Sequence, residues 1–209
     1  MINYTESFKG GVFLYKKISR MLTGYYITHN IIAEEKRKIY EYGFEILIST
    51  IFYSIYFVIL AILTKTTVES LFFLSGFFII RTIAGGYHTN SYFSCHLLSI
   101  ANHLFFILFL KICPDRYFDL ISLSLNILSI LMIFIFAPVD HVNKPFIKEE
   151  EQRFRKYSII YSIFLFVITI IYFIAISDFE NFFLSFSIGT FSAVFALMSA
   201  KIKKIKEKK

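Results

Sequence analysis

Long apolar runs dominate the chain from about residue 44 onward. A helix that crosses a bilayer needs about 20 mostly apolar residues, and the runs that reach or approach this length are Phe44–Leu63, Val68–Ala84, Tyr92–Ile112, Phe118–Ala137, Tyr157–Ile176 and Phe182–Ala200. The second run is short and holds Gly76 and Arg81, so it is the weakest of the set. The pattern predicts an all-α fold, namely a polytopic membrane protein with six transmembrane helices.

The first 43 residues follow a different pattern. Phe8, Val12, Tyr15 and Leu22 fall near one helical face, while most basic residues of this region fall elsewhere. Such a division is typical of an amphipathic helix that lies in the membrane interface. Asn30 belongs to a residue type favoured as an N-cap, so it marks the expected start of a second interfacial helix. We expect this region to tether the chain to the membrane; the alternative is a platform that docks a membrane-bound peptide.

Composition agrees with a membrane environment. The chain is 56% hydrophobic and contains 27 Phe, above the 45–50% apolar content of a typical soluble domain. Its net charge of +7 is unevenly distributed, because only Lys65, Lys111 and Arg116 of the 22 basic residues fall in predicted outer loops. The positive-inside rule therefore predicts a multi-pass protein of the cell membrane with both termini in the cytoplasm.

The C-terminal tail, residues 201–209, carries six lysines directly after an apolar run. Such a segment is attracted to anionic lipid head groups of the inner leaflet, so we expect a lipid partner and no nucleic acid. The chain shows no internal repeat and no low-complexity linker. We therefore predict a single membrane domain over residues 1–209, made of interfacial helices (1–43), a six-span bundle (44–200) and the basic tail (201–209).

The two cysteines are expected to be free thiols. Cys95 and Cys113 lie near opposite ends of one predicted helix. At a rise of 1.5 Å per residue they are about 27 Å apart, far beyond the reach of a disulfide.

The segment from Arg81 to Cys95 holds the candidate chemistry, at the predicted cytoplasmic edge of the second and third spans. Polar clusters at membrane depth are expensive and indicate function. On one continuous helix, His88 and Cys95 would lie about 10 Å apart along the axis, too far for direct proton transfer. The Gly85–Gly86 pair breaks the helix, however, and His88 can then fold back toward the next one.

The next helix can be capped by Thr89, Asn90 or Ser91, which would place Cys95 in the first turn or so. There the helix dipole and a neighbouring protonated His88 favour the thiolate, which is the nucleophilic form of cysteine. The pair around the Gly85–Gly86 break is therefore a candidate for nucleophilic chemistry at Cys95. The alternative is that Cys95 is packing material in a membrane helix and that His88 is a solvated residue of the interface. Because this segment lies at the predicted cytoplasmic ends of the second and third spans, we expect the active site on the cytoplasmic side.

A metal centre is the alternative use of these side chains. Its ligands would be His88, Cys95, His96 and His103. His96 points about 100° away from Cys95 on a helix, and His103 lies two turns deeper, so the four groups converge poorly. We therefore expect no metal and no cofactor.

The segment resembles the signature of the AgrB family, the accessory gene regulator B peptidases of Gram-positive quorum sensing. Arg81, Gly85, Gly86, His88 and Cys95 match that signature in order and spacing. A second element that resembles the family is Ala137–Phe146, in the loop after the fourth span. The resemblance covers essentially the whole chain, and none of the catalytic positions departs from the family pattern.

The resemblance implies a membrane cysteine endopeptidase. It would cleave the C-terminal part from an AgrD-like precursor through an acyl-enzyme thioester, which a residue of the peptide then attacks to close a thiolactone or lactone ring. Cys95 would be the nucleophile and His88 the base, in a protein expected to form a homodimer.

Other residues of the two motifs have supporting roles in this interpretation. Gly85 and Gly86 would shape the bend, and Pro138, Asn143 and Lys144 would help to position the peptide. Arg81 has two equal interpretations: it binds acidic groups of the substrate, or it extends toward lipid head groups. The charged run 148–156 is interpreted as a solvated helix that leads into the fifth span.

A small peptide transporter or channel without protease activity is the main alternative function. The chain shows no inverted repeat, and it has no series of acidic residues within the spans beyond Glu45. A non-catalytic scaffold is disfavoured by the reactive motif. The peptidase is therefore the predicted function.

Overall fold

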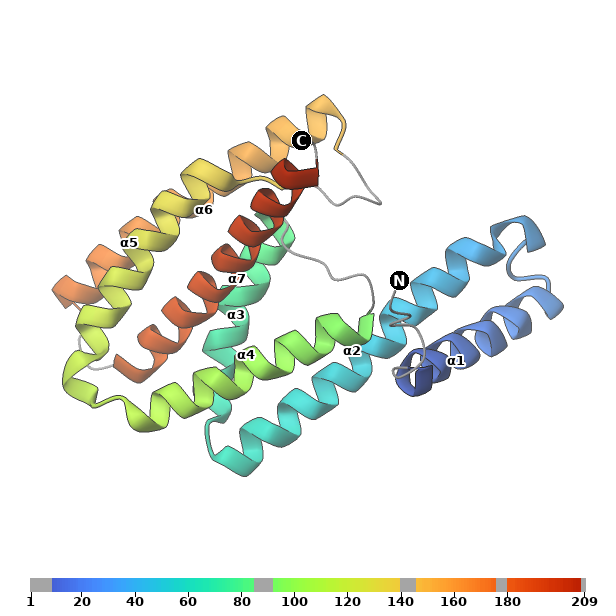
Figure 1. Cartoon of the computed structure of the whole chain (residues 1–209), viewed down its shortest axis with the longest axis horizontal. Coiled ribbons are helices and arrows are strands. Elements are labelled where there is room, and N and C mark those ends of the chain that lie inside the picture. The colour runs from blue at the N-terminus through green and yellow to red at the C-terminus, as the bar shows by residue number, and fades with distance from the viewer. Residues whose placement is uncertain (1–8, 85–91, 140–145, 176–179, 208–209) are drawn as a thin grey trace. The chain divides into compact units, whose positions relative to one another are not determined.

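The computed structural model describes residues 9–84, 92–139, 146–175 and 180–207, and over these residues the chain is helical (Figure 1). The elements, in order, are α1 (Lys9–Thr28), the 3-10 turn η1 (Glu34–Lys36), α2 (Arg37–Thr64), α3 (Thr67–Ala84), α4 (Tyr92–Ile112), the 3-10 turn η2 (Asp115–Tyr117), α5 (Phe118–Phe136), α6 (Lys148–Ala175) and α7 (Glu180–Glu207). The prediction of an all-α fold is confirmed.

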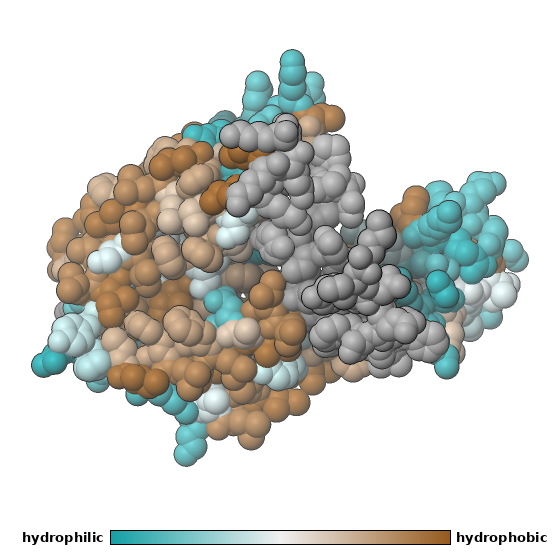
Figure 2. All heavy atoms as spheres, viewed as in Figure 1, coloured by the Kyte–Doolittle hydropathy of each residue, from teal (hydrophilic) through white to brown (hydrophobic). Residues whose placement is uncertain are grey.

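Most of the described helices suit a bilayer. Five of those in the described residues, α2, α3, α5, α6 and α7, are long and apolar enough to cross a membrane, and Leu97–Ile112 of α4 forms a shorter apolar helix. Hydrophobic residues cover the sides of the α5 and α6 helices in Figure 2, while hydrophilic residues gather near the helix ends. The chain is therefore a polytopic membrane protein, as predicted.

The chain divides into two compact units, residues 1–63 with 89–101 and residues 64–88 with 102–209. In the first unit, aromatic rings join α1 to α2: the ring centroids of Tyr15 and Phe52 are 5.7 Å apart, and those of Tyr26 and Phe44 are 5.6 Å apart. Contacts of this length are favourable aromatic pairs. Tyr15, predicted to lie on the apolar face of the first helix, is therefore engaged with α2.

The predicted helix start at Asn30 is wrong. Asn30 has φ of 57° and is the second residue after the end of α1 at Thr28. Its backbone N–H donates to Ile27 O (2.9 Å) and the next N–H, of Ile31, donates to Tyr26 O (3.0 Å). This pair of bonds is a Schellman motif, which satisfies carbonyls at a helix C-terminus and favours Gly or Asn in the left-handed conformation. Asn30 thus ends α1, and α2 begins only at Arg37.

In the second unit, α3, α5, α6 and α7 pack side by side (Figure 1). α3 and α7 approach most closely at Gly76 and Gly189, where a methyl group added to either glycine would meet the backbone of the other helix at 2.4 Å or less. Small residues at such crossings are the usual device for helix association in membranes. Gly76, which weakened the predicted second span, is therefore part of its packing surface.

One buried cluster holds together the end of this unit where α3, α5 and α7 finish. Its members are Ile80, Ala84, Ile133, Ala137, Val139, Tyr161, Leu165, Ala193, Val194 and Leu197. Since Ala84, the last residue of α3, and Ala137, the residue after α5, belong to this cluster, it fixes where the connections after both helices begin.

Candidate active site

The two segments that carry the predicted motifs meet at the end of α3. The backbone N–H of Val139 donates to the carbonyl oxygen of Ala84 at 3.0 Å, and both residues are buried. The last carbonyls of a helix have no partner within it, so this bond gives one of them a partner from another segment. It places the residue before the Gly85–Gly86 pair beside the residue after Pro138.

Arg155 of α6 holds the end of α5, just before Pro138 and Val139. Its guanidinium donates to the carbonyl oxygens of Ala137, Phe134 (2.6 Å) and Ile133 (3.5 Å), all in the last turn of α5 or just after it. Charged donors make stronger hydrogen bonds than neutral ones. Arg155 therefore caps the C-terminus of α5 and fixes the start of the second motif.

This role corrects the interpretation of the charged run 148–156 as a purely solvated helix. The run is helical and continuous with the fifth predicted span, as expected. Arg155, however, is only partly exposed and faces α5. No local signal in the sequence marks it, because its partners lie 18 to 22 residues earlier in the chain.

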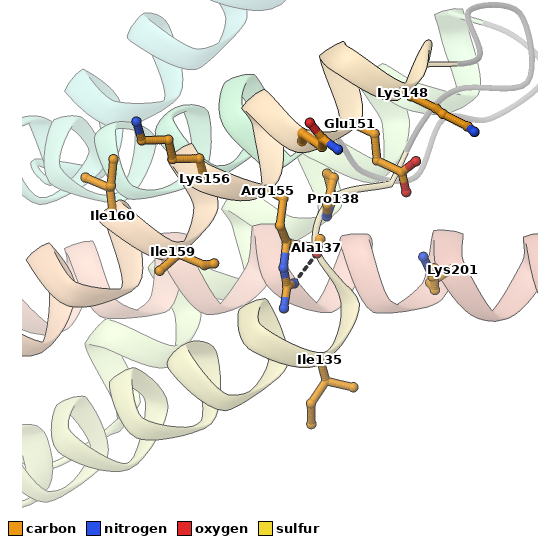
Figure 3. Close-up of a pocket in the computed structure, with 11 residues that line it drawn as sticks. Ile135, Ala137, Pro138, Lys148, Glu151, Arg155, Lys156, Ile159, Ile160 and Lys201 are labelled. Carbon is orange, nitrogen blue, oxygen red and sulfur yellow. Dashed lines mark hydrogen bonds between the residues drawn. The ribbon is translucent and has the colours of Figure 1, made fainter.

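Pro138 is buried and lines an open groove in the second unit, between the ends of α5, α6 and α7 (Figure 3). Arg81, in the last turn of α3, is half-exposed, with its guanidinium carbon 5.8 Å from the centroid of the Phe77 ring. This cation–π distance is favourable. It leaves both interpretations of Arg81 open.

Cys95 lies in the first turn of α4, because that helix begins at Tyr92, the residue predicted from the sequence. The described side chains of α4 start at Leu97. The side chain of Cys95 is therefore outside the described residues, and so are His88, Gly85, Gly86, Asn90, Asn143 and Lys144. The Cys95–His88 pairing stays a prediction.

His103, one ligand of the alternative metal centre, is fully buried in α4. Its Nε2 lies 3.0 Å from the hydroxyl of Ser70 on α3. Its ring is stacked with the rings of Phe73 and Phe106, at centroid distances of 5.8 Å and 6.1 Å. Within the described part of the chain no three His, Cys, Asp or Glu residues are grouped as metal ligands. His103 instead links α3 to α4.

Comparisons with known proteins agree on one family. Residues 16–198 match the family model described as "AgrB: Accessory gene regulator B". A "Putative AgrB-like protein 2" of Clostridium perfringens strain 13 is 32% identical over 140 residues, which are 64% of this chain and 65% of the relative. The "Accessory gene regulator protein B" of Staphylococcus aureus strain Newman is 37% identical over 95 residues, 46% of this chain and 49% of the relative.

The chain thus matches about two thirds of the Clostridium relative and about half of the Staphylococcus one. No solved structure matches it. Residues 16–198 of this chain, which match the family model, contain both motif segments that the Val139–Ala84 hydrogen bond joins. This chain therefore belongs to the accessory gene regulator B (AgrB) family.

Proposed function

We propose that this protein is a membrane cysteine endopeptidase that processes an AgrD-like precursor peptide in quorum sensing, with Cys95 as nucleophile and His88 as general base. The observation that carries the proposal is the family match over residues 16–198, because this range includes both motifs. The local geometry supports it in two ways.

The first support is the position of Cys95. A residue in the first turn of a helix lies near unpaired backbone N–H groups and the positive end of the helix dipole. Both features favour a thiolate over a thiol. The same N–H groups suit the oxyanion that forms when the thiolate attacks a carbonyl.

The second support is the anchoring of the connection between α3 and α4. His88 follows Ala84 by four residues, so covalent geometry keeps its Cα within about 14 Å of Ala84. Val139 and the core beneath it hold Ala84 in place. The point at which this connection leaves the second unit is therefore fixed.

The reaction has two balanced steps. The Cys95 thiolate attacks the scissile carbonyl, and His88 gives its proton to the departing amine, so that a thioester forms and the peptide bond breaks. A thiol or hydroxyl of the bound peptide then attacks the thioester, closes the ring and returns Cys95 to the thiolate, while its proton passes to His88. Because water would hydrolyse the thioester, a site at the membrane edge that restricts water favours cyclisation.

In this proposal the protein has six spans, with α4 as the third. Both termini and the active site lie on the cytoplasmic side of the membrane. The precursor would lie on the anionic inner leaflet, where confinement to two dimensions raises its effective concentration. Gly85, Gly86 and Asn90 shape the connection around His88. Pro138, Asn143 and Lys144 position the peptide, and the active protein is a homodimer.

Reconstitution with the precursor tests the proposal. We expect Cys95→Ser and His88→Ala to abolish cleavage while the protein stays folded in detergent. Cys113→Ser is the matched control, because Cys113 follows the far end of α4 and its thiol lies 3.8 Å from the adjacent Pro114 carbonyl oxygen. Processing by the Cys95→Ser protein at the wild-type rate would refute the assignment of Cys95 as the nucleophile, whereas no processing by the wild-type protein would favour the transporter.

A further inference from the structure

The open groove between the ends of α5, α6 and α7 has a volume of about 850 Å³, within the range of small-molecule sites. Its charged lining residues are Lys148, Glu151, Arg155, Lys156 and Lys201 (Figure 3). Four cations and one anion give this groove a net positive charge, which is complementary to an anion.

Apolar side chains line the same groove. Ile135 of α5 and Ile160 of α6 are 68% and 52% exposed, and Ile159 completes this wall. Isoleucines as exposed as these would be covered by lipid tails in a bilayer. The groove therefore presents a charged rim and an apolar wall to the same occupant.

The position of the groove matches the boundary between head groups and tails. The apolar helix α5 ends at Phe136, the apolar part of α7 ends near Ile202, and α6 begins with charged residues at Lys148. An ammonium group at this depth is attracted to lipid phosphate. A groove at this boundary meets the head group of a neighbouring lipid directly.

Arg155 has a separate task within the groove. Its guanidinium is directed toward the Ala137 carbonyl, as the dashed line in Figure 3 shows, and caps α5. The three lysines are spread along the rim, and they have no ion-pair partner among the described residues that could neutralise them. They supply the positive charge that an anionic occupant would meet.

We propose that this groove binds one anionic phospholipid, with the positive charge of Lys148, Lys156 and Lys201 along the rim attracting its head group and with Ile135, Ile159 and Ile160 against the acyl chains. The lipid would bridge α6 and α7 beside the segment that Arg155 fixes. The site differs from the diffuse attraction of the lysine tail, because it uses only Lys201 of that tail together with two lysines of α6 at one groove. It does not depend on the peptidase activity.

Native mass spectrometry of the full chain in detergent, with added phosphatidylglycerol or phosphatidylcholine, tests this site. We expect preferential binding of phosphatidylglycerol. The triple variant Lys148→Gln/Lys156→Gln/Lys201→Gln should bind it at least tenfold more weakly, since each lysine near an anionic lipid is worth roughly fivefold. Circular dichroism checks that the variant keeps its helices.

Two matched variants sharpen the test. Lys16→Gln/Lys36→Gln/Lys38→Gln removes the same charge from exposed positions outside the groove, and we expect it to bind within about twofold of wild type. Glu151→Gln removes the only acid among the lining residues, and it should strengthen phosphatidylglycerol binding severalfold.

The proposal is overturned if the groove variant binds phosphatidylglycerol as wild type does, or if the control variant loses as much affinity as the groove variant. It is also overturned if the groove variant keeps lipid binding but loses binding of the precursor peptide, because the groove would then belong to the peptide. None of these measurements uses cleavage, so failure of the Cys95 assignment leaves them interpretable.

Discussion

A methyl group added at Gly189 tests the packing of α3 against α7, which positions the end of α3 that carries Ala84. The Cβ of an alanine there would lie 2.0 Å from the carbonyl oxygen of Phe73, 2.8 Å from its carbonyl carbon and 3.0 Å from its Cα. All three atoms are backbone atoms of α3, so no change of side-chain rotamer relieves the clash. Gly189→Ala must separate the two helices.

The size of the effect follows from these distances. Ordinary van der Waals contact begins at 3.4 Å, whereas the shortest contact would be 2.0 Å, so the helices must part by more than 1 Å at this point. Overpacking of a tight interface typically costs about 1–3 kcal/mol. Since α3 also carries Ala84 and the start of the connection to His88, the separation should reduce peptide cleavage per folded molecule.

Thermal unfolding of purified protein in detergent, monitored by circular dichroism, measures the loss of stability in Gly189→Ala. Gly24→Ala is the matched control, because a Cβ at Gly24 would meet no atom within 4 Å. Alanine is the better helix former, so this variant should be stabilised by about 0.5–1 kcal/mol. A Gly189→Ala protein at least as stable as wild type would refute the close packing of α3 on α7.

Three smaller changes test other contacts. Arg155→Gln removes the charged cap of α5 and should cost about 1.5–3 kcal/mol in thermal unfolding, with cleavage also reduced; wild-type stability would contradict the capping role. Ser70→Ala removes the hydroxyl that lies 3.0 Å from His103 Nε2 and should cost about 0.6 kcal/mol, typical of hydrogen bonds between membrane helices. Tyr172→Phe removes a 2.9 Å hydrogen bond to Asp119, which should lower stability by about 1 kcal/mol without changing cleavage per folded molecule.

Apolar run length was enough to predict most of the helices. α4 has the predicted bounds, Tyr92 and Ile112, and α3 begins one residue before the predicted Val68. Run length alone could not predict that helices continue into charged sequence, as α7 does to Glu207; the charged start of α6 was predicted to be helical from its own sequence. Charged residues continue a helix without difficulty, so hydropathy alone ends these elements too early.

Asn30 and Arg155 show what the local sequence could not decide. Asparagine is favoured both as an N-cap and in the left-handed residue after a helix, and the carbonyls of Tyr26 and Ile27 select the second role. Arg155 looked solvated within a charged run, but three carbonyls at the end of α5 engage it. Both outcomes depend on partners that the folded chain supplies.

The motif residues Gly85, Gly86, His88 and Cys95 lie within residues 16–198, which match the family model. Their roles stay a prediction. The contact between Val139 and Ala84 could not be predicted, because the two residues are distant in sequence and belong to different motifs.

A trapped acyl-enzyme tests the central assignment most directly. A precursor whose ring-closing residue is replaced by alanine can acylate the enzyme but cannot release it by cyclisation. Mass spectrometry should then find the peptide fragment on Cys95, released by hydroxylamine as a thioester is, and no adduct on the Cys95→Ala protein. A fragment attached to another residue, or cleavage that continues without Cys95, would contradict the assignment.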